Sequence, residues 1–462
     1  MTDSTASQSS MQETIVAIST PPGRGGIGIV RLSGPLSASV AVQLVRLQRP
    51  LEAGRVRLAE VIDDAQERID EALITFFAAP HSYTSEDLVE IAAHGSPVVL
   101  DLVLRRALAL GARLAEPGEF TQRAFLSGRL DLTQAEAVRD LIDAQTLAQA
   151  RQAAGQLHGA LSRRVAPAKQ QLVELVALLE AGIDFAEDDV DVTSAEEIAR
   201  RIHEVEQPLQ ALEASFARGR ILHDGLTLAI VGRPNAGKSS LFNRLVERER
   251  AIVTAQAGTT RDLVTERVSL DGIPLELVDT AGLREGPRGG LDEAEQIGIH
   301  RSREAMADAA LVLLVLDATE TLNEEERKLL AEVQGRAALV VVNKSDLATP
   351  TPTAEALKGF ELVATSALTG EGITALREKI VAMATGGAAV EPGMLTNLRQ
   401  HQAILTALEA LQAASQANQN SIPHEMLLLD LYRALWALDS LTGQTTSDDI
   451  LNLIFSTFCI GK

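Results

Sequence analysis

The stretch Gly232-Arg-Pro-Asn-Ala-Gly-Lys-Ser239 decides the fold of the middle of this chain. Its spacing of glycine, lysine and serine is that of a phosphate-binding loop. In such a loop glycines let backbone N–H groups surround the phosphates, and the following helix directs its positive end at them. The apolar run Leu226–Val231 precedes the loop, and the helix-forming segment Ser240–Leu245 follows it. Strand, loop and helix in this order are the context that such a loop requires, so the sequence predicts a nucleotide site.

Three shorter motifs follow in order and identify the base. They are Asp279-Thr-Ala-Gly282, Asn343-Lys-Ser-Asp346 and Ser366-Ala367. Asn343 and Asp346 select guanine, because a carboxylate can accept from the guanine N1–H and amino group together and adenine offers no such pair of donors. Ser366-Ala367 would support the base through backbone contacts. Four motifs in sequence make a chance match rare, so the sequence predicts that GTP binds here.

Each motif residue has an expected task. Lys238 should reach the β- and γ-phosphates, the Ser239 hydroxyl should ligate Mg²⁺, and Asp279 should hold the same ion through water. The Gly282 N–H can sense the γ-phosphate. The residues of these motifs expected to contact GTP are Asn235, Ala236, Gly237, Lys238, Ser239, Ser240, Asp279, Gly282, Asn343, Lys344, Asp346, Ser366 and Ala367.

The segments on either side of the second motif bear on hydrolysis. Thr260, in Gly258-Thr-Thr-Arg-Asp262, is the expected switch threonine that closes on Mg²⁺ when the γ-phosphate is present. Leu283 stands where Ras-type GTPases carry the glutamine that orients water, and leucine cannot do this. Glu295 is the candidate replacement, although from the residues alone a solvated loop carboxylate is the stronger interpretation. No arginine finger can be assigned within the chain, so a bound cation near the phosphates could supply its charge.

Composition limits the other classes of function. The chain has 462 residues, 46% hydrophobic and 3% aromatic, so aliphatic side chains must fill about three domain cores. Its net charge of −21 excludes bulk attraction to nucleic acid, so any such role needs a local patch or a partner. The single cysteine, Cys459, excludes an intrachain disulfide. No signal peptide and no apolar run of transmembrane length is visible, which predicts a soluble cytoplasmic protein without a membrane partner.

Hydrophobic periodicity divides the chain into alternating and helical stretches. From Gly219 to about Met383, apolar strand runs alternate with helical segments, as in a parallel α/β sheet. The expected strands are Thr14–Ser19, Ile27–Leu32, Ile69–Phe77, Leu226–Val231, Leu275–Val278, Leu311–Leu316, Ala338–Val342 and Leu362–Ala364. The expected helices are Val98–Leu110, Leu130–Ala154, Ala168–Ala181, Ser194–Ala217, Thr396–Ala414 and His424–Leu441. Pro167 is expected to break or kink its helical run.

The nucleotide domain therefore lies between two helical stretches, which predicts an insertion into a surface loop of one helical domain. The expected fold class is multidomain α/β plus α. Its predicted parts are residues 1–126, an α+β domain; 127–218, the first half of a discontinuous helical domain; 219–383, an inserted Ras-like P-loop G domain; and 384–462, the second helical half with the tail Phe458-Cys-Ile-Gly-Lys462.

The four nucleotide-binding motifs and the two ends of the chain together resemble the MnmE (TrmE) family of GTPases that modify the wobble uridine of tRNA. Outside these four motifs, the segments that carry the resemblance are Pro21–Arg31, Ser82–Glu90, Pro117–Phe125, Gly128–Glu136 and the tail Phe458–Lys462. The resemblance implies a homodimer formed through the N-terminal domain, which would also bind a folate one-carbon donor, 5-formyl- or 5,10-methylene-tetrahydrofolate. It further implies that the G domains meet across the dimer and that potassium accelerates hydrolysis.

The resemblance also assigns residues. It implies that Asn235, Thr254, Gln256 and Thr259 ligate K⁺, that Thr254 and Thr259 belong to the GTP site, and that Ser239 and Thr260 hold Mg²⁺. It raises Glu295 to the catalytic residue that orients the attacking water. Arg31, Glu90, Arg129 and Lys462 match positions around the folate site. Arg129 stands where lysine is common and Ser85 where glycine is usual. Cys459 fits a small buried hydrophobe better than a reactive thiol, and both readings stay open.

The implied activity is a potassium-dependent GTPase whose opening and closing organises tRNA modification with a flavin-dependent partner of the MnmG (GidA) family. The chemistry would add a carboxymethylaminomethyl or aminomethyl group at carbon five of the wobble uridine, with tetrahydrofolate giving one carbon and the partner holding FAD. Two alternatives stay open: a ribosome-assembly GTPase, which should carry a basic module after the G domain, and a purely regulatory switch. Folate binding distinguishes them.

Two other sequence features could suggest a binding site, but a purely structural role explains them better. Gly23-Arg-Gly-Gly-Ile-Gly28 fits the dinucleotide pattern, but the strand-like run Ile27–Leu32 follows it where a helix is required. No His and Cys residues have metal-ligand spacing, so His94 is expected to be structural.

Overall fold

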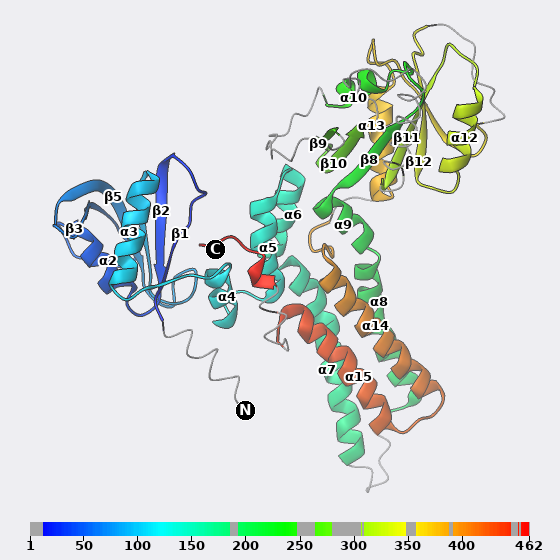
Figure 1. Cartoon of the computed structure of the whole chain (residues 1–462). Helices are drawn as coiled ribbons and strands as arrows, with labels where there is room; N and C mark the ends of the chain where they lie inside the picture. The colour runs from blue at the N-terminus through cyan, green and yellow to red at the C-terminus, as the bar shows by residue number, and fades with distance from the viewer. Residues whose placement is uncertain are drawn as a thin grey trace. The chain divides into compact units, whose positions relative to one another are not determined.

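The computed structural model describes residues 13–184, 193–246, 264–279, 306, 309–347, 357–387, 391–444, 451 and 454–461. The chain forms two compact units (Figure 1). The first contains residues 1–139, 157–159 and 436–462, and the second contains residues 140–156 and 160–435. Mixed α/β and α-helical content agrees with the expected fold class, while the four-part division made from the sequence stays a prediction. No helix in the described ranges has the length and hydropathy needed to cross a membrane.

The first unit is built on a seven-stranded sheet of order β3-β4-β5-β6-β2-β1-β7. Neighbouring strands are antiparallel except the pair β1 and β7, which is parallel. The strands are β1 Ile15–Ile18, β2 Gly25–Ser33, β3 Val45–Leu47, β4 Val56–Ile62, β5 Arg68–Phe77, β6 Leu88–Gly95 and β7 Arg113–Leu114. The three strands predicted here are confirmed, whereas β3, β4, β6 and β7 were not predicted.

Two helices, α2 (Ser37–Leu44) and α3 (Pro97–Ala109), cover one face of this sheet (Figure 1). The predicted helix near residues 98–110 is therefore confirmed as α3. Gly28 lies under α3, and a Cβ atom at Gly28 would come within 2.4 Å of Leu100 Cδ1. This glycine allows a helix to approach a strand. The dinucleotide interpretation is correctly rejected, because β2 begins at Gly25.

The C-terminal tail packs inside the same unit. Phe455 and Phe458 share a buried cluster with Leu132 and Ala135 of α5 (Leu132–Asp143). A backbone bridge joins Pro117, just before α4 (Glu119–Leu126), to Ile460. The preference for a buried Cys459 is wrong, since Cys459 is exposed. The two phenylalanines take the buried positions of the tail, and the cysteine lies just after them.

The second unit contains a group of long helices in which α8 packs against α7 and α14. The helices are α6 Leu147–Leu157, α7 Ala160–Asp184, α8 Ala195–Glu213, α9 Phe216–Asp224, α14 Leu398–Gln419 and α15 His424–Thr442. The last residue of α6 and the part of α15 from Trp436 onward belong to the first unit. Helices were predicted in these regions except over α9, of which only the first two residues lay in a predicted run. Several boundaries also differ, and α7 begins at Ala160 where Ala168 was predicted. The run predicted as Leu130–Ala154 is divided into α5 and α6, where the Thr146 hydroxyl accepts from Gln149 N (3.1 Å) and begins a new helix. The run Ser194–Ala217 is divided after Glu213.

Pro167 does not break its helix. It lies inside α7, which continues to Asp184. Val165, Ala168 and Leu172 beside it are almost fully buried. Burial of this apolar face offsets the one backbone hydrogen bond that proline cannot donate.

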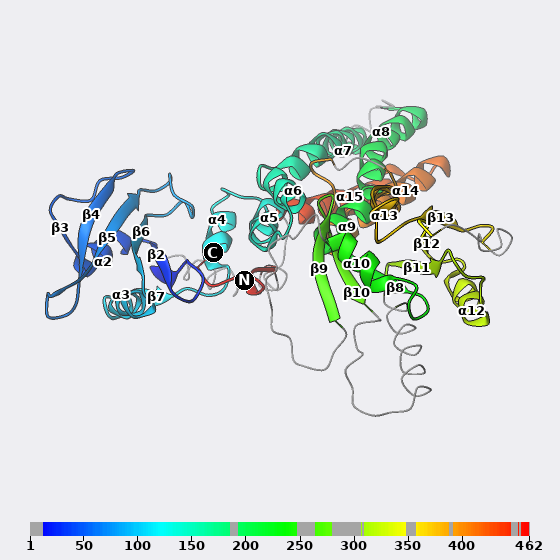
Figure 2. The same ribbon diagram turned by 90° about the horizontal axis from the view of Figure 1, so that it is seen from above.

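The nucleotide sheet of the second unit has the order β13-β12-β11-β8-β10-β9 and is parallel except at β9 (Figure 2). Its elements are β8 Leu226–Val231, α10 Lys238–Val246, β9 Val264–Leu270, β10 Ile273–Asp279, β11 Leu311–Asp317, α12 Glu324–Val333, β12 Ala338–Asn343, β13 Glu361–Ala364 and α13 Ile373–Thr385. One buried cluster joins α10 and α13 to one face, and a second joins α12 to the other. The five strands predicted here are all confirmed. Burial on both faces explains why β8, β11 and β12 are apolar almost throughout, whereas most residues of the edge strand β13 are exposed.

The helical and nucleotide-binding parts of this unit join at His223, near the end of α9. Its ring lies 3.1 Å (Nε2) from Asp140 Oδ1 and 2.7 Å (Nδ1) from Asp224 Oδ1, and Gln149 donates to its carbonyl oxygen. The Asp140 carboxylate raises the pKa of His223 to about 9, against the opposing effect of burial. His223 is therefore a cation at neutral pH.

We expect His223→Gln to destabilise the chain in a pH-dependent way. Because the folded pKa is raised from 6.5 to about 9, the stabilising contribution is complete below pH 6.5 and is lost as the pH rises through about 9. The variant should lose about 2 kcal/mol of unfolding free energy at pH 6.5, less than the full shift implies because solvent screens the pair, and little at pH 10. Urea unfolding at both pH values measures this. His203→Gln, at an exposed histidine, is the control; an equal loss at both pH values would contradict the prediction.

Candidate functional site

The predicted phosphate-binding loop connects β8 to α10, at the carboxyl end of a buried parallel strand. Gly232 has φ 145°, and a Cβ atom there would lie 2.3 Å from the Val315 carbonyl oxygen, so only glycine fits. The Lys238 ammonium donates to the carbonyl oxygens of Gly232 (2.6 Å) and Arg233 (2.9 Å). The loop therefore curves around its own lysine at the start of a helix.

One amide joins three of the four motifs. Asn343, at the end of β12 and 1% exposed, donates from Nδ2 to the Ala236 carbonyl oxygen (3.0 Å). Its Oδ1 accepts from the Ala367 N–H (3.0 Å). Arg244 of α10 holds the same segment by donating to the carbonyl oxygens of Ala367 (2.9 Å) and Leu368 (2.7 Å). The phosphate loop and the two predicted base-binding motifs are thus brought together in one place.

A buried carboxylate beside the loop was missed by sequence reasoning. Asp317 is the last residue of the fully buried strand β11 and accepts from Lys344 Nζ (2.6 Å), while Arg233 lies 3.7 Å away. Burial opposes ionisation of Asp317, but hydrogen bonds from Lys344 and Thr319 outweigh it and lower its pKa. An aspartate at the carboxyl end of a parallel strand is a recognisable signal, and it explains how Lys344 and Arg233 are held.

The exposed side chains of the site are the ones available to a ligand. Asn235, Ser239, Ser240 and Asp346 are exposed. Ser366 is fully buried, and its hydroxyl accepts from the Thr369 N–H (3.1 Å). Of the two residues predicted to select guanine, Asn343 is therefore engaged in holding the loops and Asp346 presents an exposed carboxylate.

Several predicted residues lie outside the described part of the chain. They are Thr254, Gln256, Thr259, Thr260, Gly282, Glu295 and Lys462. Asp279 ends β10, and only its backbone is described. Among the described residues there is no group of three or more His, Cys, Asp or Glu that could hold a metal ion. The remaining donors at the loop, the Ser239 hydroxyl and the Asn235 amide oxygen, fit hard cations such as Mg²⁺ or K⁺.

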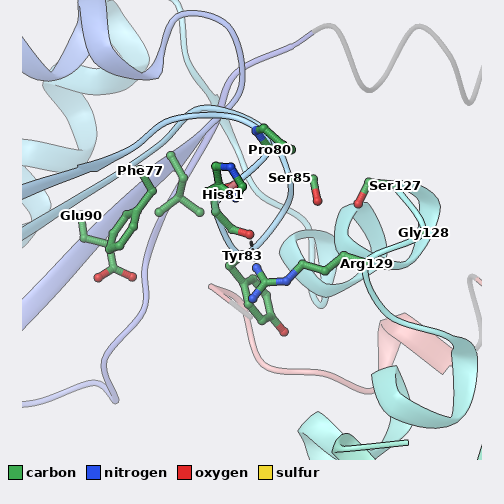
Figure 3. Close-up of a pocket in the computed structure, with 11 residues that line it drawn as sticks. Phe77, Pro80, His81, Tyr83, Ser85, Glu90, Ser127, Gly128 and Arg129 are labelled. Carbon is green, nitrogen blue, oxygen red and sulfur yellow. Dashed lines mark hydrogen bonds between the residues drawn. The ribbon is translucent and has the colours of Figure 1, made fainter. Parts of the chain in front are cut away.

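A cavity of about 590 Å³ lies in the N-terminal unit (Figure 3). Its lining residues are Phe77, Pro80, His81, Ser82, Tyr83, Ser85, Leu88, Glu90, Ser127, Gly128 and Arg129. Arg31 forms an ion pair with Glu90 (2.7 Å) and donates to the Gly461 carbonyl oxygen of the tail (3.3 Å). Three residues predicted around a folate, Arg31, Glu90 and Arg129, are therefore in or beside one cavity, and the tail reaches Arg31.

Two features of this cavity bear on the sequence expectations. Ser85 has φ 63°, in the left-handed region that glycine adopts most readily, so the backbone here would accept the glycine that the resemblance implies. The Tyr83 ring lies near the guanidinium groups of Arg31 and Arg129, a role that sequence reasoning missed. His94 Nδ1 lies 2.6 Å from Asp70 Oδ1.

Comparison with known proteins identifies relatives along almost the whole length. Residues 14–129 match the model described as "GTP-binding protein TrmE N-terminus", and residues 132–459 match "MnmE helical domain". The tRNA modification GTPase MnmE of Koribacter versatilis (strain Ellin345) is 59% identical, covering 98% of this chain and 100% of that protein. The proteins of the same name from Symbiobacterium thermophilum (45%) and Aquifex aeolicus (41%) have the same coverage.

Proposed function

The chain belongs to the MnmE family of tRNA modification GTPases, and from this premise we propose how its two sites share the work. The chain is a GTP hydrolase that acts in tRNA modification. We propose that potassium activates it, that hydrolysis requires two G domains to meet in a homodimer, and that it works in the cytoplasm on tRNA. The observation that carries the GTP assignment is the Asn343 amide, which joins the phosphate loop to both base-binding motifs.

The proposed nucleotide chemistry follows from the residues around this amide. GTP would draw the Lys238 ammonium from the loop carbonyl oxygens to the β- and γ-phosphates, and Asp346 would accept from the guanine edge. Mg²⁺ would be held by Ser239 and Thr260, with Asp279 acting through water. Glu295 would orient the attacking water, since Leu283 has no polar group to do so. Thr259 and Thr260 would close over the phosphates.

Potassium would be held by Asn235, Thr254, Gln256 and Thr259, the third through its backbone carbonyl. When bound, it supplies the positive charge that an arginine finger brings to other GTPases. Closure of two G domains would exclude water from the same region and strengthen each electrostatic contact there. The exposed Asn235 amide at the mouth of the loop supports this proposal.

We propose that the N-terminal cavity binds 5-formyl- or 5,10-methylene-tetrahydrofolate through Arg31, Glu90, Arg129 and Lys462. A cavity of about 590 Å³ that combines an aromatic ring, a carboxylate and guanidinium groups supports this choice. The Glu90 carboxylate suits N–H donors of the pterin, and the guanidinium groups suit its acceptors and carboxylates.

The proposed product is a carboxymethylaminomethyl or aminomethyl group at carbon five of the wobble uridine, with the folate giving one carbon. A flavin-dependent partner of the MnmG (GidA) family would supply FAD. The net charge of −21 supports a division in which the partner provides much of the RNA-binding surface. Family membership takes precedence over the ribosome-assembly and purely regulatory alternatives.

GTP turnover in potassium and in sodium tests the proposal. We expect at least about tenfold faster turnover in potassium, because a correctly sized cation replaces an arginine finger worth several orders of magnitude. Glu295→Ala should lower the potassium-stimulated rate about a hundredfold and leave GTP affinity nearly unchanged. Equal rates in the two salts would exclude the potassium assignment, and an undiminished rate in the Glu295 variant would exclude that residue. Glu293→Ala, two residues away, is the matched control.

A further inference from the structure

Tyr83 occupies a central place among the cations of the N-terminal cavity. Its ring centroid lies 5.5 Å from the Arg129 guanidinium carbon and 5.6 Å from that of Arg31. Its hydroxyl shares a hydrogen bond with Thr121 Oγ1 (2.9 Å), and Thr121 is fully buried. Burial raises the pKa of the Tyr83 hydroxyl, which keeps the phenol neutral. The ring is therefore anchored at its far end, and Figure 3 shows the Arg129 guanidinium beside it.

The two arginines differ in how their charge is balanced. Arg31 is paired with the Glu90 carboxylate at 2.7 Å. Arg129 donates to the Ser82 carbonyl oxygen and, within the part of the chain that the structure describes, has no carboxylate within ion-pair distance. A carbonyl oxygen occupies one of the five N–H donors of a guanidinium and leaves its charge uncompensated. The Arg129 end of the cavity therefore favours an anion.

We propose that Tyr83 is a positioning residue that holds the Arg129 guanidinium in place to bind a carboxylate of the one-carbon ligand. The inference rests on the proposed folate function and adds to it an anchoring residue and the ligand group at this end of the cavity. The negative face of an aromatic ring attracts a planar guanidinium. The Ser82 carbonyl oxygen accepts from the Arg129 guanidinium and holds the edge of that group in place. An arginine side chain that is ordered before binding loses less conformational entropy when the ligand arrives.

The experiment is a thermodynamic cycle in which Tyr83 and the ligand carboxylates are removed separately and together. Calorimetry on the full chain measures the binding affinity in each case. The two ligands are 5-formyl-tetrahydrofolate and its glutamate diamide, which keeps the size and removes both carboxylates. Tyr83→Leu should weaken 5-formyl-tetrahydrofolate binding about tenfold and diamide binding less than about twofold. Tyr83→Phe keeps the π-face and should remain within about threefold of the wild type for both ligands. Tyr83→Met is a second replacement that lacks a ring, and it should discriminate between the two ligands as Tyr83→Leu does.

Controls separate positioning from a structural role. In an Arg129→Gln background, Tyr83→Leu should no longer discriminate between the two ligands, because the ring acts through Arg129. Tyr432→Leu, at the other tyrosine of the chain, should leave both affinities unchanged. Equal weakening of both ligands by Tyr83→Leu, or no weakening, would overturn the inference. A wild-type chain that binds neither ligand would overturn the folate assignment itself, an outcome recognisable before any variant is made.

Discussion

Replacing Asp346 by asparagine should lower the affinity of this chain for GTP about a thousandfold and should create affinity for xanthosine triphosphate. A carboxylate accepts two hydrogen bonds from the guanine N1–H and amino group. Each such bond to a charged group contributes about 1.5–3 kcal/mol, so loss of the pair corresponds to roughly three orders of magnitude. The NH₂ group of an asparagine would face the guanine amino group, and two donors repel each other. In xanthine a carbonyl oxygen takes the place of the amino group, so the asparagine NH₂ can donate to it.

Equilibrium titration with fluorescent GTP and xanthosine triphosphate analogues measures both affinities. Asp346→Ala is the matched control, since it should lose GTP without gaining the xanthine nucleotide. The exposed position of Asp346 means that neither change should alter the folded core. Undiminished GTP affinity in the asparagine variant would remove Asp346 from the base site.

The sequence predicted the nucleotide part of the fold well because its signals are local. A phosphate loop needs glycine at fixed positions, and Gly232 and Gly237 both have the positive φ that this geometry demands. Parallel strands covered on both faces must be apolar nearly throughout, so β8, β11 and β12 were visible as apolar runs. The antiparallel strand β9 lacks such a run and was not predicted.

The errors came from long-range packing, which no local pattern records. Burial of the face of α7 around Pro167 decides that the helix continues there. Cys459 is exposed because Phe455 and Phe458 occupy the buried positions of the tail against residues more than three hundred positions earlier in the chain. Strand β6 carries polar residues such as Glu90 and His94 between apolar ones, and its pairing with β2 and β5 defines it.

The candidate sites show the same division. Asn343 was predicted as a base-selecting residue from its motif, whereas its hydrogen bonds to Ala236 and Ala367 needed the fold. Asp317 could have been found as an acidic residue ending an apolar strand. Tyr83 had no such signal, because its two guanidinium neighbours come from distant segments of the chain.

Gly237→Ala should abolish tight GTP binding, with an expected loss of about a thousandfold or about 4 kcal/mol. A Cβ atom at Gly237 would lie 2.1 Å from Asn343 Nδ2, and the residue has φ 93°, which alanine rarely adopts. The alanine methyl group would displace the amide that holds the Ala236 carbonyl oxygen. The phosphate loop and the guanine-binding segments would then lose their common support.

Gly335→Ala provides the matched control, because Gly335 has φ 83° and nothing within 4 Å of its Cβ position. Both variants carry similar backbone strain, so a difference in GTP affinity isolates the collision with Asn343. Asn343→Ala should also weaken binding, and the double variant with Gly237→Ala should lose less than the sum, because both changes break the same link. Additive losses would mean that the two residues act separately, and equal GTP affinity in the Gly237 and Gly335 variants would show that backbone strain alone is responsible. Neither result is expected if the whole effect comes from one amide, that of Asn343, which the phosphate and base halves of the site share.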